Sequence, residues 1–171
     1  MKTSQQGIDL IKHYESLNDG DLTMIGLQPK MDPAGIWTEG YGHAMTYNGS
    51  FLKGEEIKDI AYSNQQVHNE GEAIGLLAFD LLSREKQLTE LGLDLLQNQF
   101  DACISFIFNV GFGNFQQSTL LSRIRQSKPD FMIESAFLMW NKGGGVVLPG
   151  LTFRRQTEAK LYNDGQLIFY N

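Results

Sequence analysis

The stretch from residue 8 to residue 45 constrains the fold most, because helical spacing changes there into a glycine-rich extended run. Apolar residues recur at roughly helical spacing between residues 4 and 15, which predicts a helix that ends at Glu15, with Thr3 or Ser4 as its N-cap. After a loop, residues 36–42 favour a strand, because β-branched and aromatic side chains suit extended backbone. A helix followed by a small β region is therefore expected.

Two carboxylates stand on different predicted elements of this stretch. Glu15 ends the helix, and Asp32 precedes Pro33, which favours an extended or turn conformation for the aspartate. Thr38 follows in the predicted strand. Glycoside hydrolysis requires two carboxylates that are held on different elements and face one groove. The residues alone also fit a solvated helix end, a turn aspartate and an ordinary strand threonine.

The rest of the chain predicts an α+β protein that is mostly helical, with a small sheet near its beginning. Apolar spacing indicates a long amphipathic helix over 72–91, which would bridge the β region to the later helices, and a buried helix over 95–110. The other expected elements are a candidate strand from Thr23 to Leu27, a turn and return strand over 46–51, helices over 55–62, 117–126, 130–141 and 150–162, and a glycine loop over 143–145.

Composition narrows the classes of function. A chain of 171 residues predicts one domain, and its net charge of −6 argues against a nucleic-acid partner. The single cysteine, Cys103, excludes an intramolecular disulfide and is expected to be a buried small hydrophobe. The N-terminus lacks the apolar core of a signal peptide, and no stretch is long enough to span a membrane. We therefore expect a product that stays in the cytoplasm and does not insert stably into a membrane.

Several motifs, in the same order along nearly the whole chain, resemble the T-even-type bacteriophage lysozyme (endolysin) family, glycoside hydrolase family 24. A lone set of glutamate, aspartate and threonine would be weak, but this ordered set is specific. The matching residues are Glu15, 32–38 (DPAGIWT), 40–43 (GYGH), 98–102 (NQFDA), 108–111 (FNVG), Phe115, 118–121 (STLL), 149–151 (PGL), Arg154 and Arg155.

The resemblance implies a single lysozyme-like domain over 1–171, with a β-rich lobe over about 14–70, a helical lobe over 72–171, and helix 4–15 packing on the helical lobe. It implies an N-acetylmuramidase that hydrolyses peptidoglycan with inversion and causes host lysis. Glu15 would be the general acid, and Asp32 with Thr38 would hold the attacking water. No metal or cofactor is implied. The protein would be a monomer that depends on a holin to leave the host cytoplasm and act on the wall in the periplasm.

The resemblance also implies supporting residues. His43 would pair with Asp80 on the long helix, and Arg154 would face the catalytic glutamate across the cleft. Asn109 is either a sugar-contacting amide or a cap of its helix. The two other histidines lack zinc-like spacing, so a metal site at His43 is not expected.

The sequence departs from the family pattern between the acid and the aspartate. The intervening segment, Ser16–Met31, has 16 residues and is longer than is usual in the family. Ser16 replaces the glycine that commonly follows the acid. Asp19 and Asp21 lie in this segment but lack the following Pro-x-Gly and threonine, so Asp32 is preferred. Glu39, where the family often has an aliphatic residue, is either a carboxylate on the sheet face or an added charge in the cleft.

Two other functions remain open. A lytic transglycosylase uses one acid and closes an anhydro ring without water, and the presence of Asp32 and Thr38 argues against it. A wall-binding or structural phage protein of the same fold would have no turnover, and the complete set of three residues argues against it. The longer loop over 16–31 would favour that second alternative if it covered the cleft.

Overall fold

The computed structural model describes all residues from 1 to 171, and they form two compact units. One unit comprises residues 15–80, and the other combines residues 1–14 with residues 81–171. The division falls inside the long helix, between Asp80 and Leu81, whereas the sequence led us to expect it ahead of that helix. The N-terminal helix up to Tyr14 belongs to the same unit as the C-terminal half of the chain.

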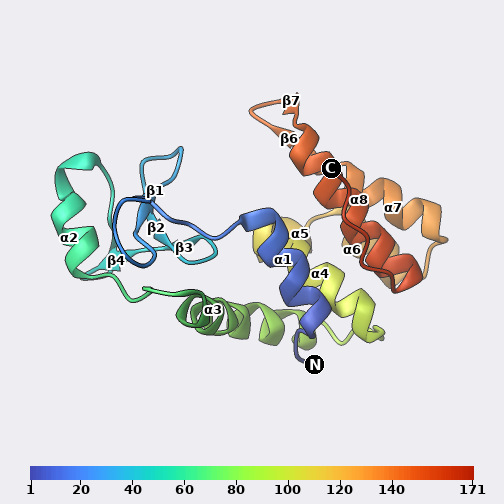
Figure 1. The fold of residues 1–171 in the computed structure, drawn as a ribbon. Coiled ribbons are helices and arrows are strands. Elements are labelled where there is room, and N and C mark those ends of the chain that lie inside the picture. Colours follow the sequence, from blue (N-terminus) through green and yellow to red (C-terminus); the bar gives the residue numbers. More distant parts are fainter. The chain divides into compact units, whose positions relative to one another are not determined.

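The unit over 15–80 contains the strands β1 to β5 (Figure 1). Its sheet has three antiparallel strands in the order β1-β2-β3, and a separate hairpin pairs β4 with β5. Lys30 of β1 pairs with Thr38 of β2, and Thr38 pairs in turn with Ala44 of β3. The elements are β1 (Lys30–Met31), β2 (Trp37–Glu39), β3 (His43–Ala44), β4 (Thr46–Tyr47), β5 (Ser50–Phe51), the 3₁₀ helix η1 (Glu55–Ile57) and α2 (Lys58–Ser63).

The central strand is shorter than expected because of its glycines. The strand predicted over 36–42 ends at Glu39, since Gly40 and Gly42 have φ angles of 58° and 85°. Left-handed backbone of this kind interrupts a strand and favours glycine. The candidate strand from Thr23 to Leu27 is absent, and that segment is loop. Trp37, Met45, Leu52 and Ala61 form the small core of this unit.

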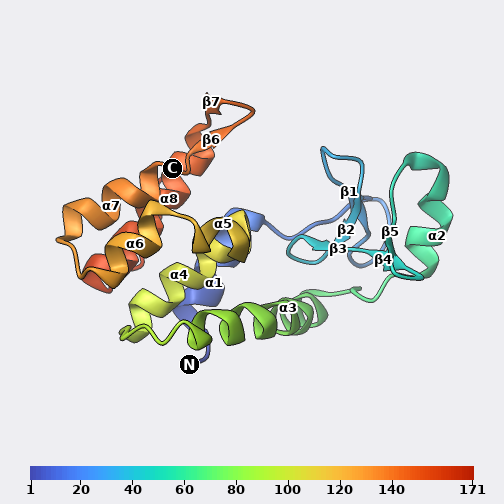
Figure 2. The same cartoon turned by 180° about the vertical axis from the view of Figure 1, so that it is seen from behind.

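The other unit is helical, and α8 lies beside α7 in both views (Figures 1 and 2). Both α4 and α7 pack on α8, and all three bury apolar side chains. The unit contains α1 (Gln5–Glu15) up to Tyr14 and the part of α3 (Glu70–Glu90) that begins at Leu81. Its other elements are α4 (Gln97–Val110), α5 (Phe112–Gln116), α6 (Thr119–Arg125), α7 (Asp130–Leu138), the hairpin β6 (Lys142–Gly143) with β7 (Val146–Val147), and α8 (Pro149–Asp164). The expected α+β class is confirmed.

Thr3 and Ser4, the two N-cap candidates, directly precede α1 and make long-range contacts that anchor its start. Ser4 donates its backbone N–H and its hydroxyl to Asp101 of α4, which is completely buried. Thr3 donates its N–H to Glu85 of α3 at 2.8 Å. Acceptors far along the chain therefore bind the N–H groups of the two residues that precede α1.

Three other expectations concern the helical unit. Cys103 is completely buried in α4, as predicted, and its burial raises the pKa of the thiol. Gly111 ends α4 at a φ of 86°, but α5 follows at once. The glycine loop over 143–145 is a tight hairpin, because Gly144 and Gly145 take the left-handed conformation that a short turn requires. None of the helices is sufficiently long and apolar to cross a bilayer.

Candidate active site

One pocket brings together the three residues that were predicted to be catalytic. It has a volume of about 580 Å³, and Glu15, Asp32 and Thr38 all line it. The remaining lining residues are Asn18, Lys30, Met31, Pro33 and Gly42. Every lining residue belongs to the unit over 15–80, so the pocket is built within one compact unit.

Glu15 reaches the pocket because α1 ends there. Ser16 has a φ of 59°, and this left-handed conformation stops the helix directly after the glutamate. A Cβ atom at Gly42 would lie 3.5 Å from Oε2 of Glu15, so the carboxylate packs against a glycine backbone. A carboxylate at the C-terminal end of a helix is electrostatically unfavourable for that helix. The charge of Glu15 therefore does not stabilise α1. Its position at the end of the helix instead provides the pocket with a carboxylate.

Asp32 is held rigidly by its own turn. Its Oδ1 atom accepts hydrogen bonds from the backbone N–H groups of Ala34 and Ile36, each at 2.8 Å. The backbone closes the same turn, since the N–H of Asp32 donates to the carbonyl of Ile36. These hydrogen bonds use only one carboxylate oxygen, so Oδ2 keeps its capacity to accept a proton or a hydrogen bond.

Thr38 is buried in β2, and its hydroxyl has two partners. Oγ1 donates to the backbone carbonyl of Lys30 at 2.9 Å and accepts a hydrogen bond from Nδ2 of Asn18 at 3.0 Å. Asn18 lies in the Ser16–Met31 insertion, and no motif in the sequence indicated that it would reach the pocket. The place of Asn18 in the pocket is evident only from its hydrogen bond to Thr38, which is 20 positions away in the sequence.

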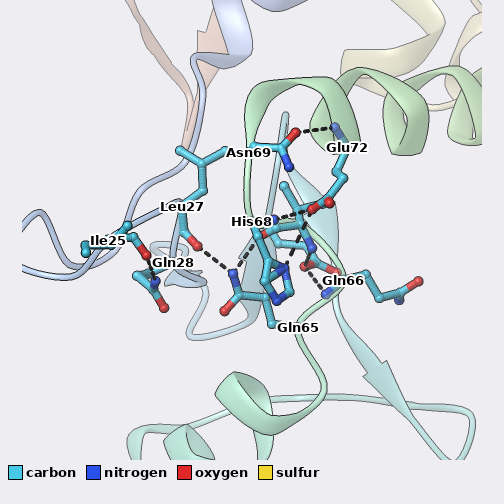
Figure 3. A network of polar contacts seen from close by, with 10 residues as sticks. Ile25, Leu27, Gln28, Gln65, Gln66, His68, Asn69 and Glu72 are labelled. Atoms are coloured by element: carbon cyan, nitrogen blue, oxygen red, sulfur yellow. Dashed lines mark hydrogen bonds and ion pairs between the residues drawn. The ribbon is translucent and has the colours of Figure 1, made fainter.

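The insertion is fastened to the segment that precedes α3, as Figure 3 shows. The N–H of Leu27 donates to the carbonyl of His68, and the side-chain amide of Gln65 donates to the carbonyl of Leu27. Glu39 lies beneath this segment and is only 2% exposed. Its Oε2 accepts the N–H groups of Gln66 and Val67. Glu39 is therefore a buried structural carboxylate and does not line the pocket.

His43 and Asp80 are in contact within the same unit. Nδ1 of His43 lies 2.9 Å from Oδ2 and 3.0 Å from Oδ1 of Asp80, which joins β3 to α3. Neither side chain lines the pocket. No group of three or more histidine, cysteine, aspartate or glutamate side chains is arranged to hold a metal ion.

Asn109 and Arg154 lie in the other unit. Arg154 is buried, and it contacts Glu158 at 3.2 Å and lies over the ring of Tyr14. Asn109 is exposed near the end of α4, and its Oδ1 accepts a hydrogen bond from Arg155 at 3.0 Å. The ion pair expected between Arg154 and the catalytic glutamate stays a prediction, because its two partners belong to different units.

A second cavity, of about 310 Å³, lies in the helical unit. It contains none of the predicted site residues. Its lining includes the acidic side chains of Asp130, Glu134 and Asp164, together with Lys160, which forms an ion pair with Asp164. The predicted chemistry thus points to the pocket around Glu15 and not to this cavity.

Comparison with known proteins places these features in context. Residues 23–158 match the family model described as phage lysozyme. The chain is 34% identical over 168 residues to an endolysin of Acyrthosiphon pisum secondary endosymbiont phage 1, a match covering 95% of this chain and 98% of that protein. It is 32% identical over 166 residues to the endolysin of Bacillus phage PZA, covering 96% of this chain but only 56% of that protein.

Among solved structures, the muramidase domain of SpmX from Asticaccaulis excentricus superposes with a TM-score of 0.71. The two chains are 31% identical, and the match covers 94% of this chain and 97% of that one. This likeness confirms the predicted lysozyme-like fold. The chain spans little more than half the length of the Bacillus phage relatives that it matches.

Proposed function

Because the chain belongs to the phage lysozyme family, we propose that it is a peptidoglycan-hydrolysing endolysin. Its activity would be that of an N-acetylmuramidase, which cleaves the β-1,4 bond between N-acetylmuramic acid and N-acetylglucosamine. The observation that carries this proposal is the single pocket lined by Glu15, Asp32 and Thr38. The finer assignment to the T-even type of glycoside hydrolase family 24 belongs to the same proposal, and the ordered motifs support it.

In the proposed reaction, Glu15 is the general acid. It gives a proton to the glycosidic oxygen as the bond from that oxygen to the anomeric carbon breaks, and the bonding electrons leave with the oxygen. The left-handed Ser16 ends α1 directly after this residue, and Gly42 leaves room beside its carboxylate. Both features support a glutamate that is presented to a substrate.

Asp32 is the proposed general base, with Thr38 as its companion. The attacking water forms a bond to the anomeric carbon, and one of its protons passes to Asp32. The two backbone N–H groups that bind Oδ1 fix the direction of the carboxylate, while Oδ2 has no protein partner. A rigid acceptor with one unused oxygen suits the orientation of a water molecule.

The reaction is proposed to invert the configuration at the anomeric carbon, because water attacks the face opposite the leaving group. A β-linked substrate then gives an α-anomer as its first product. Proton NMR of a soluble oligosaccharide digest, recorded before mutarotation, tests this directly. A first product with the β configuration would contradict inversion while leaving hydrolysis intact.

The supporting residues are also proposals. Asn109 is a candidate sugar-contacting amide, which is supported by its exposure and by an Nδ2 group that makes no hydrogen bond within the chain. Arg154 is proposed to face Glu15. The His43–Asp80 contact is proposed to hold β3 to the middle of α3 and to support the fold rather than the chemistry.

The biological setting follows from the family. The proposed partner is bacterial peptidoglycan, and the protein would act as a monomer on the wall in the periplasm. It would wait in the host cytoplasm until a holin permeabilises the membrane. Phage endolysins among its relatives support action on the cell wall.

The test measures clearing of Gram-negative cells from which the outer membrane has been stripped, with the new sugar ends identified by mass spectrometry. Glu15→Gln and Asp32→Asn should each lower the rate by about 10²–10⁴-fold, because each removes a group that transfers a proton. Glu55→Gln and Asp59→Asn are matched controls, since both residues are exposed in the same unit and lie outside the pocket.

Hydrated reducing muramic acid ends produced by wild type and both controls would support the hydrolase. Loss of these ends in Glu15→Gln and in Asp32→Asn would support both roles. Anhydro ends would identify a lytic transglycosylase instead. A folded wild-type protein that binds the wall but produces no new ends would refute the enzymatic proposal in favour of a wall-binding protein.

A further inference from the structure

The hydroxyl of Thr38 can make only a limited set of hydrogen bonds, and that limit fixes the direction of its proton. A threonine hydroxyl carries one donor proton and two acceptor lone pairs. The carbonyl oxygen of Lys30, 2.9 Å away, can only accept, so the single proton of Thr38 must point to it. The hydroxyl is therefore left with acceptor capacity alone.

The orientation of Asn18 follows from this constraint. An asparagine side chain can present either its oxygen or its NH₂ group, and the two are distinguished by the hydrogen bonds around them. Because the proton of Thr38 is already used, the atom of Asn18 that lies 3.0 Å from Oγ1 must be the donor Nδ2. The backbone of Asn18 is also fixed, since its N–H donates to the carbonyl of Gly40 at 2.9 Å.

One lone pair of Thr38 remains after these two hydrogen bonds are counted. Thr38, Asn18 and Asp32 all line the same pocket, and Oδ2 of Asp32 has no protein partner. A water molecule that donates one hydrogen to Oδ2 and the other to Oγ1 has both hydrogens engaged. Its own lone pairs are then free to face an anomeric carbon.

We infer that Asn18 is a positioning residue, which holds the Thr38 hydroxyl in the orientation that accepts a hydrogen bond from the attacking water. This inference rests on the proposed function. It assigns the Ser16–Met31 insertion a part in positioning the attacking water, in addition to lining the pocket through Asn18, Lys30 and Met31. Asn18 touches neither the substrate nor the water in this role, because it acts through Thr38.

A double-mutant cycle tests whether Asn18 acts through Thr38. Thr38→Val keeps the shape of the side chain and removes the hydroxyl. Rates of reducing-end formation on soluble peptidoglycan fragments would be measured for wild type, Asn18→Ala, Thr38→Val and the double variant. Asn18→Ala alone should lower kcat roughly three- to tenfold, the rate equivalent of one neutral hydrogen bond, with KM within about twofold. In the Thr38→Val background the same change should alter kcat by less than about twofold.

Two further variants separate positioning from folding. Asn18→Asp has nearly the same shape but cannot donate, so it should lose at least as much of kcat as Asn18→Ala, and it takes the place of that variant if Asn18→Ala does not fold. Asn64→Ala is the matched control, because it removes an amide whose hydrogen bond to Ile60 lies in the same unit and outside the pocket. It should keep wild-type kcat.

The outcomes are distinct. Coupling between Asn18 and Thr38, with kcat lowered and KM preserved, supports the inference. Equal losses in both backgrounds, a change confined to KM, or no change in Asn18→Ala would overturn it while leaving the hydrolase intact. A wild-type protein that forms no reducing ends refutes the proposed function, and this inference fails with it.

Discussion

Replacing the buried carboxylate of Glu39 is expected to destabilise the unit over 15–80, first in the segment that precedes α3 and in the insertion that this segment binds. Glu39 is 2% exposed, and its Oε2 accepts the N–H groups of Gln66 at 2.8 Å and Val67 at 2.9 Å. Glu39→Leu puts an apolar side chain in place of the carboxylate and leaves both donors without this acceptor. The N–H of Val67 is fully buried, so water cannot readily replace the carboxylate there.

The expected loss can be worked out from these contacts. A buried donor that loses its partner costs about 1–3 kcal/mol, so two of them predict a loss of about 2–6 kcal/mol in the free energy of unfolding. The loss is reduced because burying the carboxylate is itself costly, and its Oε1 has no partner. Glu39→Gln keeps an oxygen acceptor and should lose only about 1–2 kcal/mol, since neutral hydrogen bonds are weaker than charge-assisted ones.

Urea unfolding followed by circular dichroism measures this loss, and amide hydrogen exchange localises it. The segment held by Glu39 also binds the insertion, because the carbonyl of His68 accepts the N–H of Leu27. The amides of Val67 and Leu27 should therefore exchange about a hundredfold faster in Glu39→Leu for a local loss of about 3 kcal/mol. Glu55→Gln serves as the exposed control. A Glu39→Leu variant with wild-type stability, or with unchanged protection at Leu27, would refute this account.

Three other outcomes follow from the structure. Ser16→Gly should raise the free energy of unfolding by about 0.5–1 kcal/mol, because the left-handed φ of 59° costs less at glycine; a lower urea midpoint would contradict this. Burial alone would raise the pKa of Glu85, but the Thr3 N–H and the Lys2 ammonium outweigh burial and hold this pKa below its usual value. The contribution of the Glu85 carboxylate to stability is therefore present near pH 7 and is lost as the pH falls through the folded pKa. Glu85→Gln should therefore be less stable than wild type at pH 7 and differ little at pH 3 in thermal unfolding; an equal difference at both would reject the contact. Burial of Cys103, with a smaller contribution from the charge of Glu158, raises the pKa of its thiol. Iodoacetamide should therefore label Cys103 only in denaturant. Rapid labelling of the native protein, measured by mass spectrometry, would disprove the burial of Cys103.

Local patterns in the sequence were sufficient for the main elements of the fold. The apolar spacing that predicted helices ending at Glu15 and near Val110 is matched by α1 and α4, because helical periodicity and glycine stops act over a few residues. Ser118 caps α6 through the N–H of Leu121, which follows from the same local chemistry. The ordered motifs also identified the three residues that line one pocket, although their catalytic roles stay proposals.

Tertiary structure decided the features that depend on partners distant in sequence. Asp101 anchors Ser4 at the start of α1, and Glu39 holds a segment 27 and 28 residues away. Asn18 lies beside Thr38 because the insertion packs against β2 in the folded chain. Composition and periodicity describe which faces are apolar, but they do not specify which donor meets which acceptor. A buried polar group must find its partner wherever the packed chain places one, and that pairing exists only in three dimensions.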